Sequence, residues 1–230
     1  MNKTRLIVVR HGNTFNAGDL IRRVGAATDI PLTEKGVAQG SAVGKALKAA
    51  GIEVDKIFSA PLLRTKRSAQ EIAASYPGTE ICEEKFLTEL DYGIDDGAAE
   101  DDVVLRLGIV ESAASINAAT SLDDLRSAGK EALRRWDKEA VLPRAWEHLK
   151  DDVADRSVQW RKFGAMVFEK FASKTVVAVT SNGIARFSTA LLDENSRLPE
   201  SLKLATGAYG IYVWDNGKWV CEAWNVRPEL

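Results

Sequence analysis

The stretch VVRHGNTFN, residues Val8–Asn16, decides how the rest of the chain is interpreted. Four apolar residues, Leu6–Val9, lead directly into an arginine, a histidine and a glycine. A short apolar run of this kind predicts a buried strand of a parallel sheet, and ligands of α/β proteins bind at the carboxyl ends of such strands. Arg10 and His11 therefore offer a cation and an imidazole to an anionic ligand. The tripeptide alone is weak evidence, because a lone histidine at a strand end is more often structural.

The composition is that of a globular protein with no unusual partner. The chain has 230 residues, 45% of them hydrophobic and 28% charged, with a net charge of −2. This balance argues against general binding to nucleic acid or an anionic membrane. The apolar run near the start is too short for a signal peptide, and we expect a cytoplasmic protein. Cys82 and Cys221 lie far apart in the sequence and favour two reduced thiols over a metal site or a disulfide.

The spacing of apolar residues predicts an α/β fold. Two further apolar runs, Lys56–Ser59 and Thr175–Thr180, are expected to form parallel strands. Helical patterns cover Thr33–Gly51, with Thr33 as the N-cap, and Pro61–Tyr76, with the proline near the helix start. Alternation of strands and helices predicts three αβα layers around a mostly parallel central sheet.

Two segments depart from this alternation. The sequence YGIYVWDNGKWVCEAW predicts an antiparallel hairpin that turns at Asn216-Gly217 at the edge of the sheet. An exposed edge of this kind could pair with a second copy, so a homodimer is possible. The segment Ala98–Trp160 is charged and helical, and we interpret it as a cap inserted over one end of the sheet. Its three tryptophans are expected to be core residues.

Five ordered motifs carry a resemblance to a known family. They are RHGNT, PLTEKGVAQG, SAPLLRTKRSAQ, LTELDYGIDDG and VVAVTSNGIAR. This series resembles the histidine phosphatase superfamily, which has the phosphoglycerate mutase-like fold. The resemblance covers most of the chain outside the expected cap. It implies a single domain over residues 1–230, with the cap at about 98–160.

The resemblance assigns chemical roles to four residues. It implies that His11 is the nucleophile that accepts a phosphoryl group and that Arg10 and Arg64 hold the phosphoryl oxygens. Glu89 matches the family's proton donor to the leaving oxygen. The set is chemically coherent, because two cations offset phosphate charge while an imidazole attacks and a carboxylic acid protonates the alkoxide. In the alternative interpretation, Glu89 and Arg64 form an ordinary surface ion pair.

The later motif departs from the family pattern. Asn182 occupies the position of the family's second catalytic histidine, directly before Gly183, and both are expected to contact phosphate. An asparagine donates a neutral hydrogen bond and brings no positive charge, so the site is weakened without being abolished. The only other histidine, His148, lies in the cap. Asn16 falls one residue before a phosphate-contacting asparagine of the family.

These residues predict a metal-independent phosphomonoesterase that works through a phosphohistidine on a small phosphorylated metabolite. No cofactor is expected, and the ligand is a phosphomonoester or inorganic phosphate. Two alternatives stay open: a phosphoglycerate mutase-type phosphotransferase, and a non-catalytic protein that binds a phosphorylated ligand or a partner. A basic cluster in the cap could recognise a second anionic group, although the acidic residues interleaved with it favour a solvated helix face. Its members are Arg134, Arg135, Lys138 and Arg144.

Overall fold

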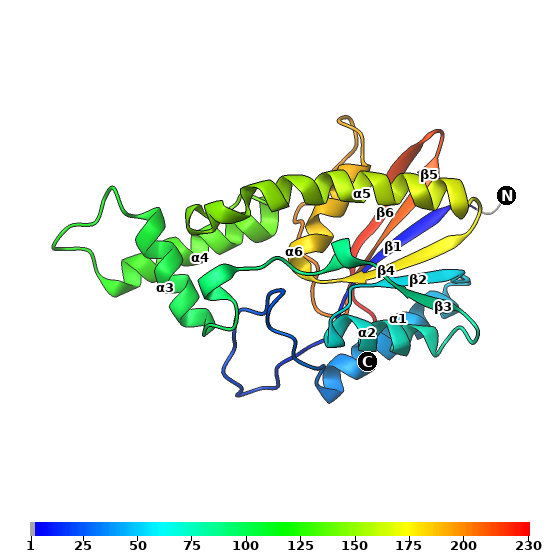
Figure 1. Ribbon diagram of the computed structural model, residues 1–230, viewed down its shortest axis with the longest axis horizontal. Coiled ribbons are helices and arrows are strands. Elements are labelled where there is room, and N and C mark those ends of the chain that lie inside the picture. The colour runs from blue at the N-terminus through cyan, green and yellow to red at the C-terminus, as the bar shows by residue number, and fades with distance from the viewer. Residues whose placement is uncertain (1–2) are drawn as a thin grey trace.

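A six-stranded sheet with helices on both faces forms the body of the computed structural model, which describes residues 3–230 (Figure 1). The strands lie in the order β3-β2-β4-β1-β5-β6. The first four are parallel to one another, and β5 and β6 are antiparallel additions at one side. Their bounds are β1 Arg5–Arg10, β2 Lys56–Ser59, β3 Glu80–Glu83, β4 Thr175–Thr180, β5 Tyr209–Asp215 and β6 Lys218–Val226.

Helices cover both faces of this sheet and extend beyond it. The α-helices are α1 Glu34–Ala49, α2 Leu63–Ala73, α3 Glu100–Glu111, α4 Leu122–Glu139, α5 Lys150–Lys170 and α6 Asn182–Ala185. Short 3₁₀ helices are η1 Lys85–Leu87, η2 Gly93–Asp95, η3 Arg144–Leu149 and η4 Arg186–Leu191. Within the described residues, none of these helices has the length and apolar character needed to cross a bilayer.

Strand β1 shows why the sheet needs cover on both faces. Leu6 and Val8 belong to the core that α5 covers, whereas Ile7 and Val9 belong to the core under α1 and α2. Successive side chains of a strand point to opposite faces, so a continuous apolar run is buried on both sides. The expected αβα arrangement with a mostly parallel sheet is confirmed.

Local signals in the sequence placed most boundaries correctly. Thr33 is the N-cap of α1, and its hydroxyl accepts a hydrogen bond from the Gly36 N–H at 3.1 Å. Asn216 and Gly217 both have positive φ angles, 48° and 83°, as a type I′ hairpin between β5 and β6 requires. Helix α2 ends at Ala73, so the expected extension to Tyr76 was too long. Strand β3 was missed, because its sequence EICE contains no apolar run.

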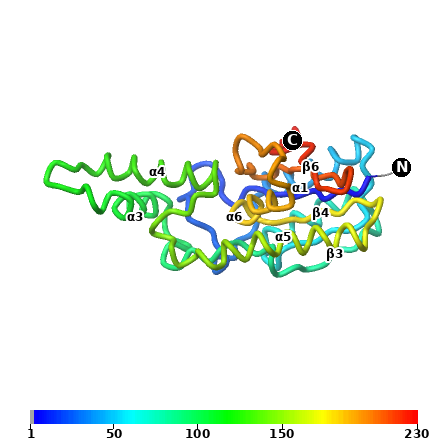
Figure 2. The backbone as a smooth tube through the Cα atoms, turned by 90° about the horizontal axis from the view of Figure 1, so that it is seen from above, coloured from blue at the N-terminus to red at the C-terminus, as the bar shows by residue number. Residues whose placement is uncertain are grey.

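The segment expected to form a cap contains α3, α4 and η3. Figures 1 and 2 show α3 and α4 side by side, projecting away from the sheet. Helix α5 runs unbroken through Trp160, where the cap was expected to end, and packs Phe163 against Phe58 of the sheet. The three tryptophans of this segment are at most 1% exposed, so they are core residues. The cap boundaries themselves stay a prediction.

Backbone contact holds α3 against α4. A Cβ atom added to Gly108 would overlap the carbonyl of Leu125, and one added to Gly129 would overlap the carbonyl of Val104. Two glycines thus let the helices approach at van der Waals distance without side chains between them.

Gly129→Ala is expected to lower the free energy of unfolding by about 1–3 kcal/mol, because the added methyl forces the helices apart. Chemical denaturation followed by circular dichroism measures this loss. Ser127→Ala on the exposed side of the same helix is the control and should be nearly neutral. Equal stability of the two variants would contradict the close packing of α3 on α4.

Candidate active site

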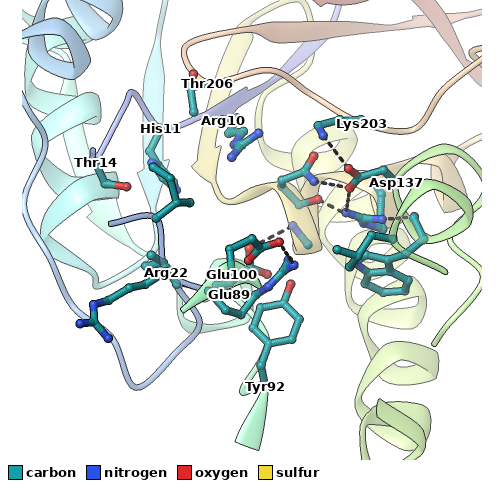
Figure 3. Close-up of a pocket in the computed structure, with 18 of the residues that line it drawn as sticks. Arg10, His11, Thr14, Arg22, Glu89, Tyr92, Glu100, Asp137, Lys203 and Thr206 are labelled. Atoms are coloured by element: carbon teal, nitrogen blue, oxygen red, sulfur yellow. Dashed lines mark hydrogen bonds and ion pairs between the residues drawn. The ribbon is translucent and has the colours of Figure 1, made fainter. Parts of the chain in front are cut away.

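The carboxyl ends of β1 and β4 bring distant residues together. The two strands pair in parallel with Arg10 opposite Thr180, and the His11 N–H continues the ladder to the Thr180 carbonyl at 3.0 Å. The turn after β4 then supplies Asn182 and Gly183 beside His11. These residues, together with Arg10 and Glu89, line a cavity of about 900 Å³ (Figure 3).

The His11 side chain is buried and held in one orientation. It is 6% exposed, and its Nδ1 lies 2.8 Å from the carbonyl oxygen of Gly12. A carbonyl only accepts hydrogen bonds, so in the neutral imidazole Nδ1 carries the proton and Nε2 keeps its lone pair. Burial, and then the positive charges of Arg64 and Arg10, lower the pKa of His11 well below its usual 6.5. At neutral pH the ring is therefore uncharged.

Glycines bring α1 close to the loop that carries His11. A Cβ atom on Gly12 would overlap the backbone of Gly36, the third residue of α1. The Gly12 N–H donates to the Ser68 hydroxyl at 3.2 Å, which ties the same loop to α2. The glycine of the Arg-His-Gly signature is thus required by backbone packing.

Two arginines near His11 have mostly neutral partners; Arg10 lines the cavity, whereas Arg64 is buried behind its wall and does not line it. Arg10 donates from Nη1 to the Leu204 carbonyl at 2.7 Å. Arg64 is fully buried and donates to the carbonyls of Thr28 and Gly25 at 2.8 and 2.9 Å. Burial lowers the pKa of both guanidinium groups, which nevertheless stay cationic in proteins. The Nε–H of each arginine is buried and has no partner among the described residues.

The Glu89 carboxylate is fixed by two backbone amides. Leu90 N–H donates to Oε1 at 2.9 Å, and Gly183 N–H donates to Oε2 at 3.0 Å. A Cβ on Gly183 would overlap Glu89 Oε1, so this position needs a glycine for the carboxylate to fit. Glu89 is 5% exposed and Arg64 bonds to carbonyls, so the alternative of a surface ion pair between them is wrong.

Asn182 lines the cavity with its amide engaged by the protein. Its Nδ2 donates to Asp137 Oδ1 at 3.0 Å, and its Oδ1 accepts from the Leu204 N–H at 3.0 Å. Asp137 on α4 also pairs with Arg186 at 3.2 Å and Lys203 at 2.6 Å (Figure 3). Burial alone would raise the pKa of Asp137, but the two cations outweigh burial and lower it. Asn182 therefore joins the β4 end to the cap helix.

The remaining expected residues fall into two groups. Asn16 is exposed and lies outside the cavity lining, where Asn13 and Thr14 stand instead. His148 is also exposed and does not line the cavity. Of the expected basic cluster, Arg134 and Lys138 line the cavity; Arg135 and Arg144 do not.

Sequence reasoning missed several polar residues of the cavity. They are Arg22, Arg23, Tyr92, Glu100, Lys130, Asp137 and Lys203. The adjacent pair Arg22-Arg23 could have indicated an anion-binding site, because these two cations follow shortly after the loop that carries His11. Arg23 lies over the rings of Tyr92 and Trp146 at 5.3 and 5.1 Å and forms an ion pair with Glu100. Within residues 3–230, no three His, Cys, Asp or Glu side chains are grouped to hold a metal ion.

The lowered pKa of His11 predicts a pH-dependent stability. Below about pH 6.5, His11 binds a proton in the unfolded chain but stays neutral in the folded chain. The free energy of unfolding therefore falls by about 1.4 kcal/mol per pH unit until the pH reaches the pKa of His11 in the folded state. Urea denaturation of the wild type and His11→Gln from pH 8 to pH 5 measures the difference. The wild type should lose more stability than the variant below pH 6.5, and parallel curves would contradict a neutral buried imidazole.

Comparison with known proteins agrees with the fold. Residues 6–227 match the model of the histidine phosphatase superfamily (branch 1). The chain is 27% identical over 211 residues to a 2,3-bisphosphoglycerate-dependent phosphoglycerate mutase of Beijerinckia indica, covering 90% of each protein.

Solved structures show the same fold. A phosphoglycerate mutase from Bacillus anthracis superposes with a TM-score of 0.70 at 22% identity, covering 97% of this chain and 93% of that one. A phosphoserine phosphatase from Entamoeba histolytica, solved with 3-phosphoglyceric acid, gives a TM-score of 0.63 at 19% identity and 96% coverage of both chains. Because the family model spans nearly the whole chain, this protein belongs to the histidine phosphatase superfamily.

Proposed function

We propose that this protein is a metal-independent phosphomonoesterase that forms a phosphohistidine on His11. One observation carries the proposal: a neutral imidazole with a free Nε2 lines a large cavity together with the guanidinium of Arg10, and the buried guanidinium of Arg64 lies close enough to act on its charge. An uncharged nitrogen lone pair is a nucleophile, and fixed cations stabilise the charge of a transferring phosphoryl group.

In the first step, His11 Nε2 forms a bond to phosphorus while the ester P–O bond breaks. Glu89, carrying a proton, transfers it to the departing alkoxide oxygen. Arg10 and Arg64 offset the charge on the phosphoryl oxygens. Asn182 has a second amide hydrogen for a neutral bond to phosphate, since only one is used by Asp137. Gly183 supports the site chiefly by its lack of a side chain beside Glu89.

In the second step, water attacks the phosphorus of the phosphohistidine. The Glu89 carboxylate accepts the proton of this water, the P–N bond breaks, and the electron pair returns to His11 Nε2. Inorganic phosphate leaves, and Glu89 is again protonated for the next cycle. The site thus balances protons and charge without a metal ion.

The cavity favours a substrate with a second acidic group. Cations line it well beyond the proposed phosphate position, namely Arg22, Arg23, Lys130, Arg134, Lys138 and Lys203. The carboxylates among the lining residues are Glu89, Glu100 and Asp137, so the cavity is electropositive. A small phosphorylated acid fits this field better than a neutral phosphorylated alcohol.

Phosphoglycerate mutase activity is the second candidate, because the Beijerinckia indica mutase is similar over 90% of the chain. A mutase keeps the phosphoryl group on histidine while its substrate turns round. Incubation with 3-phosphoglycerate and 2,3-bisphosphoglycerate, followed by ³¹P NMR, separates the two activities: a phosphatase releases inorganic phosphate, and a mutase yields 2-phosphoglycerate.

A screen of phosphomonoesters tests the proposed hydrolysis. The wild type should release phosphate without added metal and in the presence of a chelator, and acid-labile phosphate should be trapped on the protein. His11→Ala should abolish both, with a fall in kcat of about 10³-fold or more, because the nucleophile is lost. The matched control is His148→Ala, which lies outside the cavity and should keep full activity. Phosphate binding without hydrolysis of any ester would favour a non-catalytic protein.

Asn182→His tests the consequence of a neutral side chain at this position. An imidazole beside the Asp137 carboxylate is expected to carry a proton and to donate a charge-assisted hydrogen bond to phosphate. Such a bond is about twice as strong as the neutral bond from asparagine. We expect kcat to rise by about tenfold and the gain to fade at alkaline pH as the new ring loses its proton. Asn182→Ala is the control for lost bonds to Asp137 and Leu204. If both variants lose activity equally, those bonds matter more than added charge.

A further inference from the structure

The guanidinium of Arg64 owes its orientation to a short loop. Its two Nη groups donate to the carbonyls of Gly25 and Thr28, both in the segment that follows the nucleophile loop. The nearest carboxylate, Asp29, is 4.0 Å away at the edge of the same segment. Any movement of residues 25–28 therefore moves the two acceptors that set the direction of this buried cation.

The loop is in turn held by one carboxylate from a distant part of the chain. Asp96, directly after η2, accepts hydrogen bonds from Gly25 N–H at 3.0 Å and Ala27 N–H at 2.9 Å. Its Oδ1 also accepts from the Thr28 hydroxyl. Each oxygen of the carboxylate is used, so Asp96 replaces the regular backbone pairing that this loop lacks.

Close packing leaves Asp96 little freedom. A Cβ atom on Gly25 would overlap Asp96 Oδ2, so the carboxylate lies directly against the loop backbone. The Ala26 N–H is held separately by the Leu90 carbonyl at 2.9 Å, next to Glu89. The same strip of chain, residues 89–96, thus carries the proposed proton donor at one end and fixes the loop under Arg64 at the other.

We propose that Asp96 is a positioning residue for Arg64: through residues 25–28 it sets the orientation of the guanidinium that binds the phosphoryl group. This inference rests on the proposed phosphatase function. Asp96 touches neither substrate nor reacting atoms. We expect Asp96 to act by holding the Arg64 guanidinium in place and not through its negative charge.

The sign of the effect on anion binding separates the two roles. Asp96→Asn removes a negative charge near Arg64. If charge alone mattered, inorganic phosphate would bind more tightly and activity would hold or rise. If Asp96 positions Arg64, the amide nitrogen of asparagine faces a backbone N–H that it cannot accept from, the loop shifts, and phosphate binds more weakly.

The experiment is a double-mutant cycle on the full chain, with hydrolysis of p-nitrophenyl phosphate and calorimetric titration of inorganic phosphate as readouts. Asp96→Asn should lower kcat/KM by about 10- to 100-fold, the usual effect of a small misplacement of a catalytic group. In an Arg64→Ala background the same change should cost less than about twofold, because the residue it positions is gone. The free energy of unfolding should fall by about the same amount in both backgrounds, so that a difference in the loss of kcat/KM between them does not come from stability.

Two matched variants complete the test. Asp91→Asn removes an exposed carboxylate of the same strip, bonded to Gly93 N–H at 2.9 Å, and should leave activity unchanged. If Asp96→Asn does not fold, Thr28→Val removes only the hydroxyl bond to Asp96, and Thr28→Ser should restore it. We expect Thr28→Val to lower kcat/KM by about threefold to tenfold and Thr28→Ser to recover most of the loss.

Three outcomes would overturn the proposal. They are tighter phosphate binding by Asp96→Asn, an additive loss in the Arg64→Ala background, and equal effects of Asp96→Asn and Asp91→Asn. A wild type that neither hydrolyses the ester nor binds phosphate would instead refute the proposed function, and this inference with it. A wild type that is active with an indifferent Asp96 would refute the inference alone.

Discussion

Parallel pairing of β1 with β4 is the constraint on which the candidate site depends. With Arg10 opposite Thr180, both strands end at the same level of the sheet. The His11 N–H bond to Thr180 extends this register into the first residue of the loop. A shift of one residue would turn His11 to the other face. The imidazole, the turn at Gly183 and the Glu89 carboxylate bonded to that turn are consequently placed by backbone hydrogen bonds of the central sheet.

The site is built at an energetic cost that the rest of the fold offsets. Removing a guanidinium from water is expensive unless its charge and its N–H groups are satisfied. Arg10 and Arg64 donate from their Nη groups to carbonyl oxygens, their Nε–H groups have no partner among the described residues, and the one ion pair, Arg64 with Asp29, is long at 4.0 Å. Farther out, Arg186 and Lys203 share Asp137, and Arg23 has Glu100. Carboxylates therefore offset part of the positive charge in the outer cavity, whereas Arg10 and Arg64 beside His11 bond chiefly to carbonyl oxygens.

Sequence patterns predicted the parts of the molecule that follow from local rules. Features that depend on residues close together in the sequence were predicted and confirmed. They are the apolar runs of β1, β2 and β4, the Thr33 cap and the Asn-Gly turn. The edge strand β3 could not be predicted because only two apolar residues lie between its two glutamates, and it is held by pairing with β2. Five predicted residues line one cavity: Arg10, His11, Glu89, Asn182 and Gly183. They come together because β1 and β4 are neighbours in the sheet and Glu89 bonds to Gly183 in the turn after β4. Asp137 and Lys203 could not be found, since Asp137 bonds to Asn182 from 45 residues away and Lys203 bonds to Asp137 from 66 residues away, both through tertiary packing.

Helix α5 connects the cap to the main core through one continuous helix. Its 21 residues form a rod about 31 Å long, clamped at one end by Phe163 and Val167 in the main core and carrying Trp160 at its middle. Because a continuous helix has no hinge, the half of α5 in the main core and the half in the cap move as one rigid body. The wall of the cavity on this side is formed by α4, whose Trp136 shares the main core with Trp160 of α5. The position of this wall is thus set by packing inside the protein and not by contact with a ligand.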